Sequence, residues 1–334
     1  MDIYLKNAFL HIIDREGGDP VFSQVELDLS TAYIRDYLTK KIQKISSAQT
    51  KTGKLIDHSV MAGLIQSAPQ DFPNFSQQLV TRWYDIYKQS EDAPSADVFI
   101  VLFEEDTKLQ VAFLKINFTE AYTHFVDSQE LGITNQLIIN RAILGGKSQK
   151  PDEGITIDIE NLTFELIEKK YSFSGEKRSY LSSQVFDSEP VASLDENVKV
   201  IKKVAEKIGK KFETPTYDVV AEVKEAVFDT INKTGTITSK EVAEKVFKDN
   251  VTAKLAFEEE VQEKGYVDQA PLLKEVKEIT EKKYSKQKLK LSNGIEMTVP
   301  LEVYRNPELI EFVNNPDGTI SVMIKNVEEV INRL

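Results

Sequence analysis

The run Val98-Phe99-Ile100-Val101-Leu102-Phe103 decides how the first half of the chain folds. It is too short for a typical helix, and its β-branched and aromatic residues favour a strand. Because its apolar residues are consecutive, we expect both faces of this strand to be buried, which places it in the interior of a sheet. The polar stretch 104–107 predicts a turn, so residues 109–116 are expected to form the neighbouring antiparallel strand.

Strand patterns continue on both sides of this pair. They cover residues 8–13, 21–29, 136–144, 155–159 and 162–173. Apolar residues at helical spacing predict two helices, one between Ser30 and Ile45 and one between Pro73 and Lys88. The N-terminal part is therefore expected to be an antiparallel-rich mixed sheet of about five to seven strands, accompanied by helices.

Helical periodicity dominates after Asp187. Apolar positions predict helices over residues 197–212, 215–232 and 239–248. Thr238 and Glu241 have the spacing of a capping box at the start of the third helix. Near the end of the chain, Asn293-Gly294 and the stretch 315–318 are turn signals between alternating segments, and each predicts a hairpin.

Together these patterns predict an α+β fold in two domains. Residues 1–187 are expected to form an N-terminal antiparallel-rich mixed sheet with helices. Residues 188–334 are expected to form a mostly helical C-terminal domain that ends in a small β-sheet. The length of 334 residues agrees with two domains, because single hydrophobic cores rarely grow beyond about 250–300 residues.

The composition excludes several classes of site. The chain contains no cysteine, which rules out disulfides, thiolate nucleophiles and zinc sites built on cysteine. No apolar run approaches the roughly 20 residues of a membrane-spanning helix. The stretch from Met1 to Asn7 lacks the pattern of a secretory signal. We therefore expect a cytoplasmic protein that does not contact a membrane.

The three histidines, His11, His58 and His124, give no pattern of a catalytic or metal site. None lies in a nucleophile motif, and no two have the His-x-x-x-His spacing of a zinc site. His11 lies within an apolar strand pattern, so we interpret it as a structural histidine. The run Gly145-Gly146-Lys147-Ser148 is interpreted as a surface turn, because Arg141 stands where a phosphate-binding loop requires glycine. No cofactor is expected.

One enzymatic hypothesis rests on Asp152, Glu168 and Lys170. Together with Pro151 they match the Pro-Asp…Glu-x-Lys spacing of many metal-dependent nucleases. In such sites two carboxylates hold Mg²⁺ and the lysine acts on the attacking water. Glu168 and Lys170 share the parity of the apolar residues in the predicted strand, which is unfavourable for a metal site unless a bulge intervenes. Because the spacing of these residues matches, a magnesium-dependent nuclease is kept as an alternative function.

Lysines gather in three segments of a chain whose net charge is −12. Residues 37–56 contain five lysines and no acid, residues 199–211 contain six lysines and one acid, and residues 282–290 contain five lysines and no acid. Charges further apart than the Debye length of about 8 Å are screened, so local clusters can attract a polyanion despite the negative total. Such clusters can also be the solvated faces of amphipathic elements.

The second lysine segment has the most regular spacing. Four of its lysines recur at intervals of four, four and three residues, which places them on one helical ridge of about 16 Å. Such a ridge can follow the phosphate backbone of duplex DNA, whereas stacking on single strands would require interleaved aromatic residues. The residues that we expect to contact DNA are Lys40, Lys41, Lys44, Lys199, Lys203, Lys207, Lys210, Lys282, Lys283 and Lys286.

Several patterns follow one another in a particular order along the chain. They are residues 8–13, 99–103, Tyr180-Leu181, residues 257–260, Gly265-Tyr266, the hairpin at 315–318 and a final helix that ends at Leu334. In this order they resemble the bacterial nucleoid-associated protein family of the NdpA type, over nearly the whole chain. The resemblance implies association with the nucleoid, through DNA binding that is direct or mediated by a partner, and no catalytic activity.

The resemblance and the lysine clusters favour a non-enzymatic protein that binds chromosomal double-stranded DNA without strong sequence preference. The magnesium-dependent nuclease is one alternative. Another alternative is a scaffold that is recruited to the nucleoid by a partner, such as another nucleoid protein. We also include a homodimer among the candidate assemblies, because it would double each basic segment.

Overall fold

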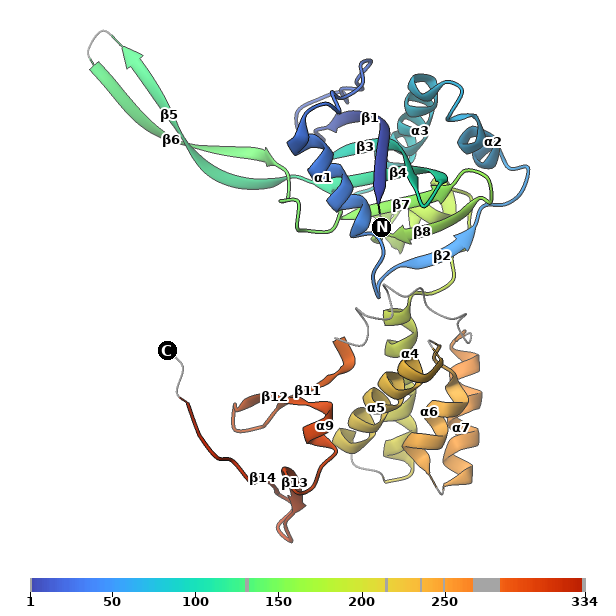
Figure 1. The fold of residues 1–334 in the computed structure, drawn as a ribbon, viewed down its shortest axis with the longest axis vertical. Helices are drawn as coiled ribbons and strands as arrows, with labels where there is room; N and C mark the ends of the chain where they lie inside the picture. The colour runs from blue at the N-terminus through green and yellow to red at the C-terminus, as the bar shows by residue number, and fades with distance from the viewer. Residues whose placement is uncertain are drawn as a thin grey trace. The chain divides into compact units, whose positions relative to one another are not determined.

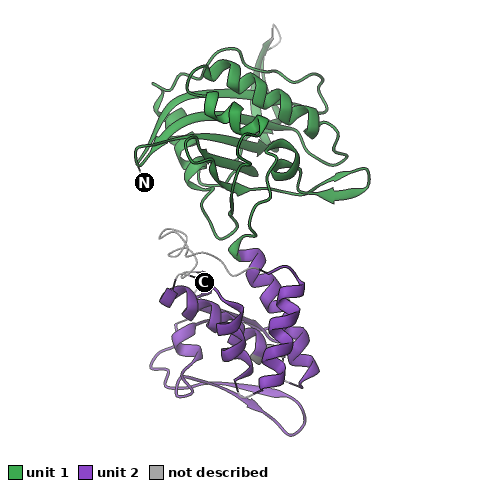
Figure 2. Cartoon of the chain, turned by 90° about the vertical axis from the view of Figure 1, so that its right-hand side faces the viewer, with its two compact units in different colours: residues 1–194 green, residues 195–334 purple. Residues whose placement is uncertain are grey.

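The computed structural model describes residues 2–129, 132–213, 216–234, 236–248, 250–266 and 283–331. Two compact units, residues 1–194 and 195–334, are drawn in green and purple in Figure 2. The division follows Leu194, whereas the sequence placed the end of the first domain at Asp187. The main sheet lies in unit 1, and unit 2 begins with four helices and ends with two hairpins in its described part. The chain therefore has the predicted α+β fold.

Unit 1 is built on a six-stranded antiparallel sheet (Figure 1). Its strands in spatial order are β1 (Ile3–Ile13), β3 (Ala96–Glu105), β4 (Lys108–Asn117), β7 (Glu153–Asp158), β8 (Thr163–Ile167) and β2 (Lys51–Lys54). β3 contains the apolar run 98–103 and pairs with β1 on one side and β4 on the other. The interior position predicted from the consecutive apolar residues is confirmed.

Helices cover both faces of this sheet, which explains why β3 is apolar without alternation. They are α1 (Ala32–Gln43), α2 (Val60–Ser67) and α3 (Phe72–Tyr87). On the α1 face, Leu38 packs in one cluster with Phe99 and Val101. Val98 and Ile100 alternate with those residues and belong to a second cluster, under α2 and α3. Each face of β3 therefore has a core of its own.

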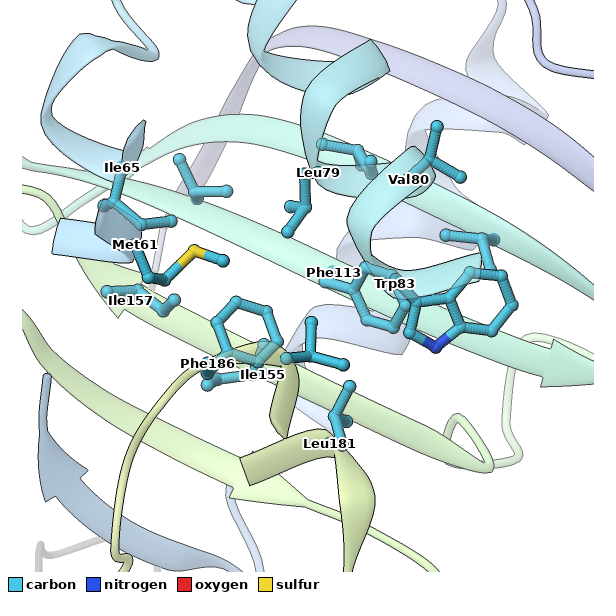
Figure 3. Close-up of a cluster of buried hydrophobic side chains, with 14 of the residues drawn as sticks. Met61, Ile65, Leu79, Val80, Trp83, Phe113, Ile155, Ile157, Leu181 and Phe186 are labelled. Atoms are coloured by element: carbon cyan, nitrogen blue, oxygen red, sulfur yellow. The ribbon is translucent and has the colours of Figure 1, made fainter. Parts of the chain in front are cut away.

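The larger of these two clusters is shown in Figure 3. Trp83 of α3 stacks on Tyr87 and lies against Phe113 of β4, with ring centroids 4.4 and 5.5 Å away. The indole N–H of Trp83 donates to the hydroxyl of Tyr180 over 3.0 Å. Phe186 closes the cluster against Phe113. The apolar stripe that predicted a helix over residues 73–88 is thus the buried side of α3.

Residues 21–29 do not form the predicted strand. Val21 forms an isolated bridge to Ile12 of β1, and the N–H of Leu27 donates to the carbonyl of Ala8 over 2.8 Å, but the segment forms no continuous ladder. Within the segment, the Asp28 carboxylate accepts a hydrogen bond from the backbone N–H of Ser30. Local bonds of this kind compete with strand pairing, so the alternating pattern was insufficient evidence for a strand.

The predicted strand 136–144 exists as β6 (Gly132–Ile143), but it lies outside the main sheet and pairs with β5 (Thr119–Gln129). The predicted strand 162–173 is interrupted, because the N–H of Lys169 bonds to the carboxylate of Glu153 instead of a strand. The elements that follow β8 are β9 (Tyr171–Phe173), β10 (Glu176–Arg178) and the π-helical turn η1 (Leu181–Val185).

A buried ion pair joins β4 to β7. Lys115 Nζ lies 3.0 Å from Glu153 Oε2, and both side chains are fully buried. Lys115 also donates to Asn117 Oδ1 over 2.7 Å and to the hydroxyl of Tyr171 over 3.0 Å, while Glu153 accepts from the hydroxyl of Tyr180. Burial lowers the pKa of Lys115, and the Glu153 carboxylate opposes this shift. Every partner needed to hold the two charges is therefore supplied by the fold.

His11 is a structural residue, as its place in an apolar strand predicted. Its side chain is fully buried, and burial lowers its pKa to about 4. The backbone N–H of Ser23 donates to Nδ1 over 3.2 Å, so Nε2 carries the proton and donates to the Ser76 hydroxyl over 2.9 Å. The neutral imidazole thus satisfies one donor and one acceptor inside the core.

We expect unit 1 to lose stability as the pH falls from about 6.5 to about 4, because the unfolded chain then binds a proton at His11 that the folded chain excludes. The loss attributable to this residue is on the order of 3 kcal/mol. Urea unfolding followed by the fluorescence of Trp83, the single tryptophan, measures it. The variant His11→Gln should lack this component, and an equal acid loss in both proteins would refute the assignment.

Unit 2 begins with four helices. They are α4 (Leu194–Lys211), α5 (Thr216–Thr234), α6 (Ser239–Phe247) and α7 (Val251–Glu263). The hydroxyl of Thr238 accepts from the N–H of Glu241 and donates to its carboxylate, which confirms the predicted capping box. Phe247 and Phe257 meet in the core between α6 and α7, with ring centroids 5.6 Å apart.

The C-terminal part of unit 2 contains the two predicted hairpins. They consist of β11 (Lys286–Lys290) with β12 (Glu296–Pro300), and β13 (Ile310–Asn314) with β14 (Ile320–Ile324), and the short helix α9 (Leu301–Tyr304) lies between them. Residues 325–331 are not helical, which corrects the expected final helix. Val330 and Ile331 are exposed there, and a short helix without a packing surface is not stable. Residues 332–334 lie outside the described part.

Candidate nucleic-acid interface

Helix α4 presents the predicted lysine ridge to solvent. Its buried side consists of Ile201, Val204, Ala205 and Ile208, which pack into the core of unit 2. The helix lies close to α5 at Gly209, where an added Cβ would approach the Val219 side chain to 2.7 Å. Because the helical repeat is 3.6 residues, lysines spaced four, four and three apart fall on the opposite side. Lys199, Lys203, Lys207 and Lys210 are all exposed there.

Most charges of this ridge are available to a ligand. Lys207 pairs with Glu260 of α7 over 2.7 Å, and its side chain remains 65% exposed. Among the described residues, no acid forms an ion pair with Lys199, Lys203 or Lys210. An exposed ion pair contributes at most about 1 kcal/mol, so a phosphate group can compete for Lys207.

The structure adds lysines to this ridge from two other elements. The Gln287 side chain of β11 donates to the carbonyl of Ala221 over 3.2 Å, which fastens the β11 strand to α5. Lys224 of α5 donates to the backbone carbonyl of Lys286. Burial lowers the pKa of Lys224, and the positive charges of Lys288 and then Lys202 lower it further. Like charges therefore gather where α4, α5 and β11 meet.

We call this surface the basic face. Its residues are Lys199, Lys202, Lys203, Lys207 and Lys210 of α4, Lys224 of α5, and Lys286 and Lys288 of β11. Lys202 has one acidic neighbour on its own helix, Glu206, at 3.8 Å. The sequence pattern contained the lysines of α4 and β11, but it gave no sign of Lys224, because only the packing of β11 on α5 reveals that neighbourhood.

Lys283, another predicted contact residue of this unit, is not part of the basic face. Lys283 pairs with Asp195 over 2.5 Å and lies over the ring of Tyr284. Lys282 lies outside the described residues. The Asp195 carboxylate is largely buried, at 9% exposure, so Lys283 is engaged in holding the start of α4.

The predicted lysines of unit 1 differ from one another. Lys40 and Lys44 are exposed at the C-terminal end of α1, where the helix dipole favours cations. Lys41 is fully buried and donates to the carbonyls of Gly146 and Gln149, each over 3.0 Å. Burial lowers the pKa of Lys41. This lysine fastens α1 to the loop that follows β6, so we leave it out of the proposed interface.

The two carboxylates of the nuclease hypothesis, Asp152 and Glu168, each interact with a different set of partners. Asp152 accepts from Lys169 over 2.6 Å, and Glu168 pairs with Lys51 over 3.1 Å and accepts from the N–H and hydroxyl of Ser182. Within the described part of the chain, no three carboxylate or histidine side chains are placed to hold a metal ion. The nuclease alternative is therefore not supported.

A comparison with protein families identifies the family of the chain. The family described as nucleoid-associated protein YejK matches residues 9–332. The chain belongs to that family. Membership of the YejK family gives it a nucleoid-associated role, as the resemblance implied. No individual curated protein matches the chain. In the part that the structure describes, no helix is both long and apolar enough to span a membrane.

Proposed function

We propose that the basic face binds the phosphate backbone of double-stranded DNA in the bacterial nucleoid, without strong sequence preference and without catalysis. The observation that carries this proposal is the ridge of exposed lysines on α4, extended by Lys224 and Lys288. Membership of the YejK family supports the location in the cytoplasmic nucleoid.

The chemistry of the basic face favours backbone contacts over base recognition. All of its cationic groups are lysines. Lysine ammonium groups bind phosphates as point charges, whereas bidentate reading of guanine is mostly done by arginine. The ridge of about 16 Å covers the rise of roughly five nucleotides along one strand. Affinity should therefore come from counterion release and change little with sequence.

The negative net charge does not prevent this binding. The charge of −12 is the sum over the whole chain, and charges beyond a Debye length of about 8 Å are largely screened. A phosphate on α4 therefore experiences mainly the nearby ammonium groups. Burial lowers the pKa of Lys224, and repulsion from Lys288 and Lys202 lowers it further; a bound phosphate would relieve that repulsion.

Fluorescence anisotropy with duplexes of contrasting base composition tests the proposal. We expect direct binding at low salt, with affinities that agree within about threefold between sequences, since backbone contacts carry no sequence information. Absence of binding at low salt, combined with recovery of the protein in the nucleoid fraction of cells, would instead favour a scaffold recruited by a partner.

Lys202→Gln and Lys288→Gln test the extension of the basic face beyond the ridge. Each substitution is expected to reduce the slope of log K against log salt concentration by about 0.9, the value for one lost phosphate contact. Lys54→Gln and Lys88→Gln remove exposed lysines of unit 1 that pair with nearby acids, and we expect no change from them. Equal slopes in all four variants would limit the interface to the other lysines.

A further inference from the structure

The hairpin formed by β5 and β6 extends away from the six-stranded sheet (Figure 1). We call residues 119–129 and 132–143 the arm. Both strands pair only with each other, in the part of the chain that the structure describes. A two-stranded hairpin is at best marginally stable by itself in water and needs a third strand or a packing partner.

Strand register divides the side chains of the arm into two unlike faces. Residues directly opposite each other share a face, and the pairs include Tyr122 with Ile139 and His124 with Leu137. The face that contains these pairs holds five large apolar residues, namely Tyr122, Val126, Ile133, Leu137 and Ile139. We call it the apolar face. The opposite face is mixed, with Thr123, Gln136, Asp127 and Thr134 beside Phe125 and Ile138.

The apolar face is open to solvent. Leu137 and Ile133 are each 74% exposed, and Tyr122 is 68% exposed. At its base the arm borders a cleft of the same unit, which is lined by Ile139 of the apolar face and by Thr123 and Ile138 of the opposite face. Contiguous exposed apolar side chains of this kind mark interaction surfaces.

The chemistry of the apolar face limits what can cover it. Over residues 122–128 and 133–139 it carries no lysine or arginine, so phosphate groups of nucleic acid find no counter-charge there. A matching surface must itself be apolar, elongated and two strands wide. The same face on a second copy of the chain meets all three requirements, and a two-fold axis brings the same patch of two copies into contact.

We propose that the arm is a dimerisation element, in which the apolar face packs against the apolar face of a second copy with the two arms antiparallel. Stacking two hairpins produces a four-stranded sandwich, which satisfies the need for additional strands. Each face is about 24 Å long at about 3.4 Å per residue. Two faces of this size bury on the order of 1,000 Å², the lower end for a specific interface.

Charge distribution favours contact through the arm over contact elsewhere. Two chains of net charge −12 repel each other. The segments 122–128 and 133–139 contain one formally charged residue, Asp127, which lies on the opposite face. A strand of 11 residues is about 37 Å long, which exceeds several Debye lengths. Joining through the arms therefore brings little like charge together.

Sedimentation velocity in the absence of DNA tests the proposal. We expect the full chain to sediment as a dimer, with twice the monomer mass of 37.9 kDa. Leu137→Asp places one charge per chain inside the interface and should weaken the dimer at least about 100-fold, since a buried charge without a partner is strongly unfavourable. Gln136→Asp makes the same change in charge on the adjacent residue, whose side chain is on the opposite face, and should leave the dimer intact.

A cross-linking measurement keeps the test valid if a charged variant folds poorly. The chain has no cysteine, so a single introduced cysteine is the sole target of a short bis-maleimide. Leu137 lies near the middle of the apolar face, where a two-fold axis brings the two copies together. Leu137→Cys should therefore cross-link efficiently and Gln136→Cys poorly. A wild-type chain that stays monomeric, or equal behaviour of the two positions in either experiment, would overturn the proposal.

Discussion

Replacing Lys199, Lys203, Lys207 and Lys210 together by glutamate is expected to abolish DNA binding. Counterion release contributes about 0.9 log units per phosphate contact at about 0.1 M salt, so loss of four contacts lowers the affinity about 4,000-fold. The introduced carboxylates add repulsion. The four side chains are exposed and lie opposite the buried stripe of α4, so the core of unit 2 is unaffected. Fluorescence anisotropy against a labelled duplex measures the loss.

Two control proteins separate the interface from the total charge. Substitution of the same four lysines by glutamine tests the loss of contacts without adding acid at the C-terminal end of α4, where a carboxylate opposes the helix dipole. Lys54, Lys88, Lys108 and Lys177 are exposed lysines of unit 1, and their replacement by glutamate changes the net charge equally. If this second set weakened binding as much as the α4 set, the basic face would have no special role.

Lys115→Met is expected to destabilise unit 1 by about 3–5 kcal/mol, because it leaves the carboxylate of Glu153 buried without its counter-charge. Both side chains are fully buried, and the two charged groups lie 3.0 Å apart. The remaining hydrogen bonds to Glu153, from the hydroxyl of Tyr180 and the backbone N–H of Lys169, come from neutral groups and cannot replace an ammonium group. Urea unfolding followed by the fluorescence of Trp83 reports the change, since the tryptophan lies in the same core.

A double variant shows whether the cost comes from the unpaired charge. Lys115→Met with Glu153→Gln removes both charges, and we expect it to be more stable than Lys115→Met alone. Lys54→Met provides the comparison, because it breaks an ion pair in which both side chains are more than half exposed. It should not change unfolding measurably. A double variant less stable than the single one would show that the ion pair is not what the core requires.

The sequence predicted the elements whose patterns are local. The run 98–103, the helix at 73–88 and the capping box at Thr238 are each determined by neighbouring residues, and each is confirmed. The two C-terminal hairpins are confirmed for the same reason, since Asn293-Gly294 and the turn at 315–318 specify their strands. The predicted strand at 21–29 and the predicted final helix over 325–331 were wrong, because packing and local side-chain bonds decide the structure of these segments.

Features that depend on tertiary pairing were missed. The burial of Lys41 was missed although the sequence contained a sign of it. Lys41 is three residues after Leu38 and one before Ile42, on the apolar side of α1. Lys115 and Glu153 are charged residues within continuously buried stretches of β4 and β7. Only the register of β4 with β7 makes them partners. The arm was missed because β5 is rich in polar residues, and its apolar face emerges only when it pairs with β6.

The functional account separates two tasks within one chain. The basic face of unit 2 is proposed to bind DNA, and the apolar face of the arm in unit 1 is proposed to join two copies. A dimer would bring two basic faces to one DNA molecule, which raises the effective affinity without any new contact. Neither task requires a catalytic group, in agreement with the separate engagement of Asp152 and Glu168.

The salt dependence of DNA binding tests the central claim most directly. For the wild-type protein we predict a linear plot of log K against log salt concentration with a slope of about −4 or steeper, corresponding to at least four phosphate contacts. The slope should be the same for duplexes of different sequence, and it should become shallower by about 3.6 in the variant with four glutamines on α4, which loses four phosphate contacts. A slope near zero in the wild type, or one that depends strongly on base sequence, would contradict binding through the basic face.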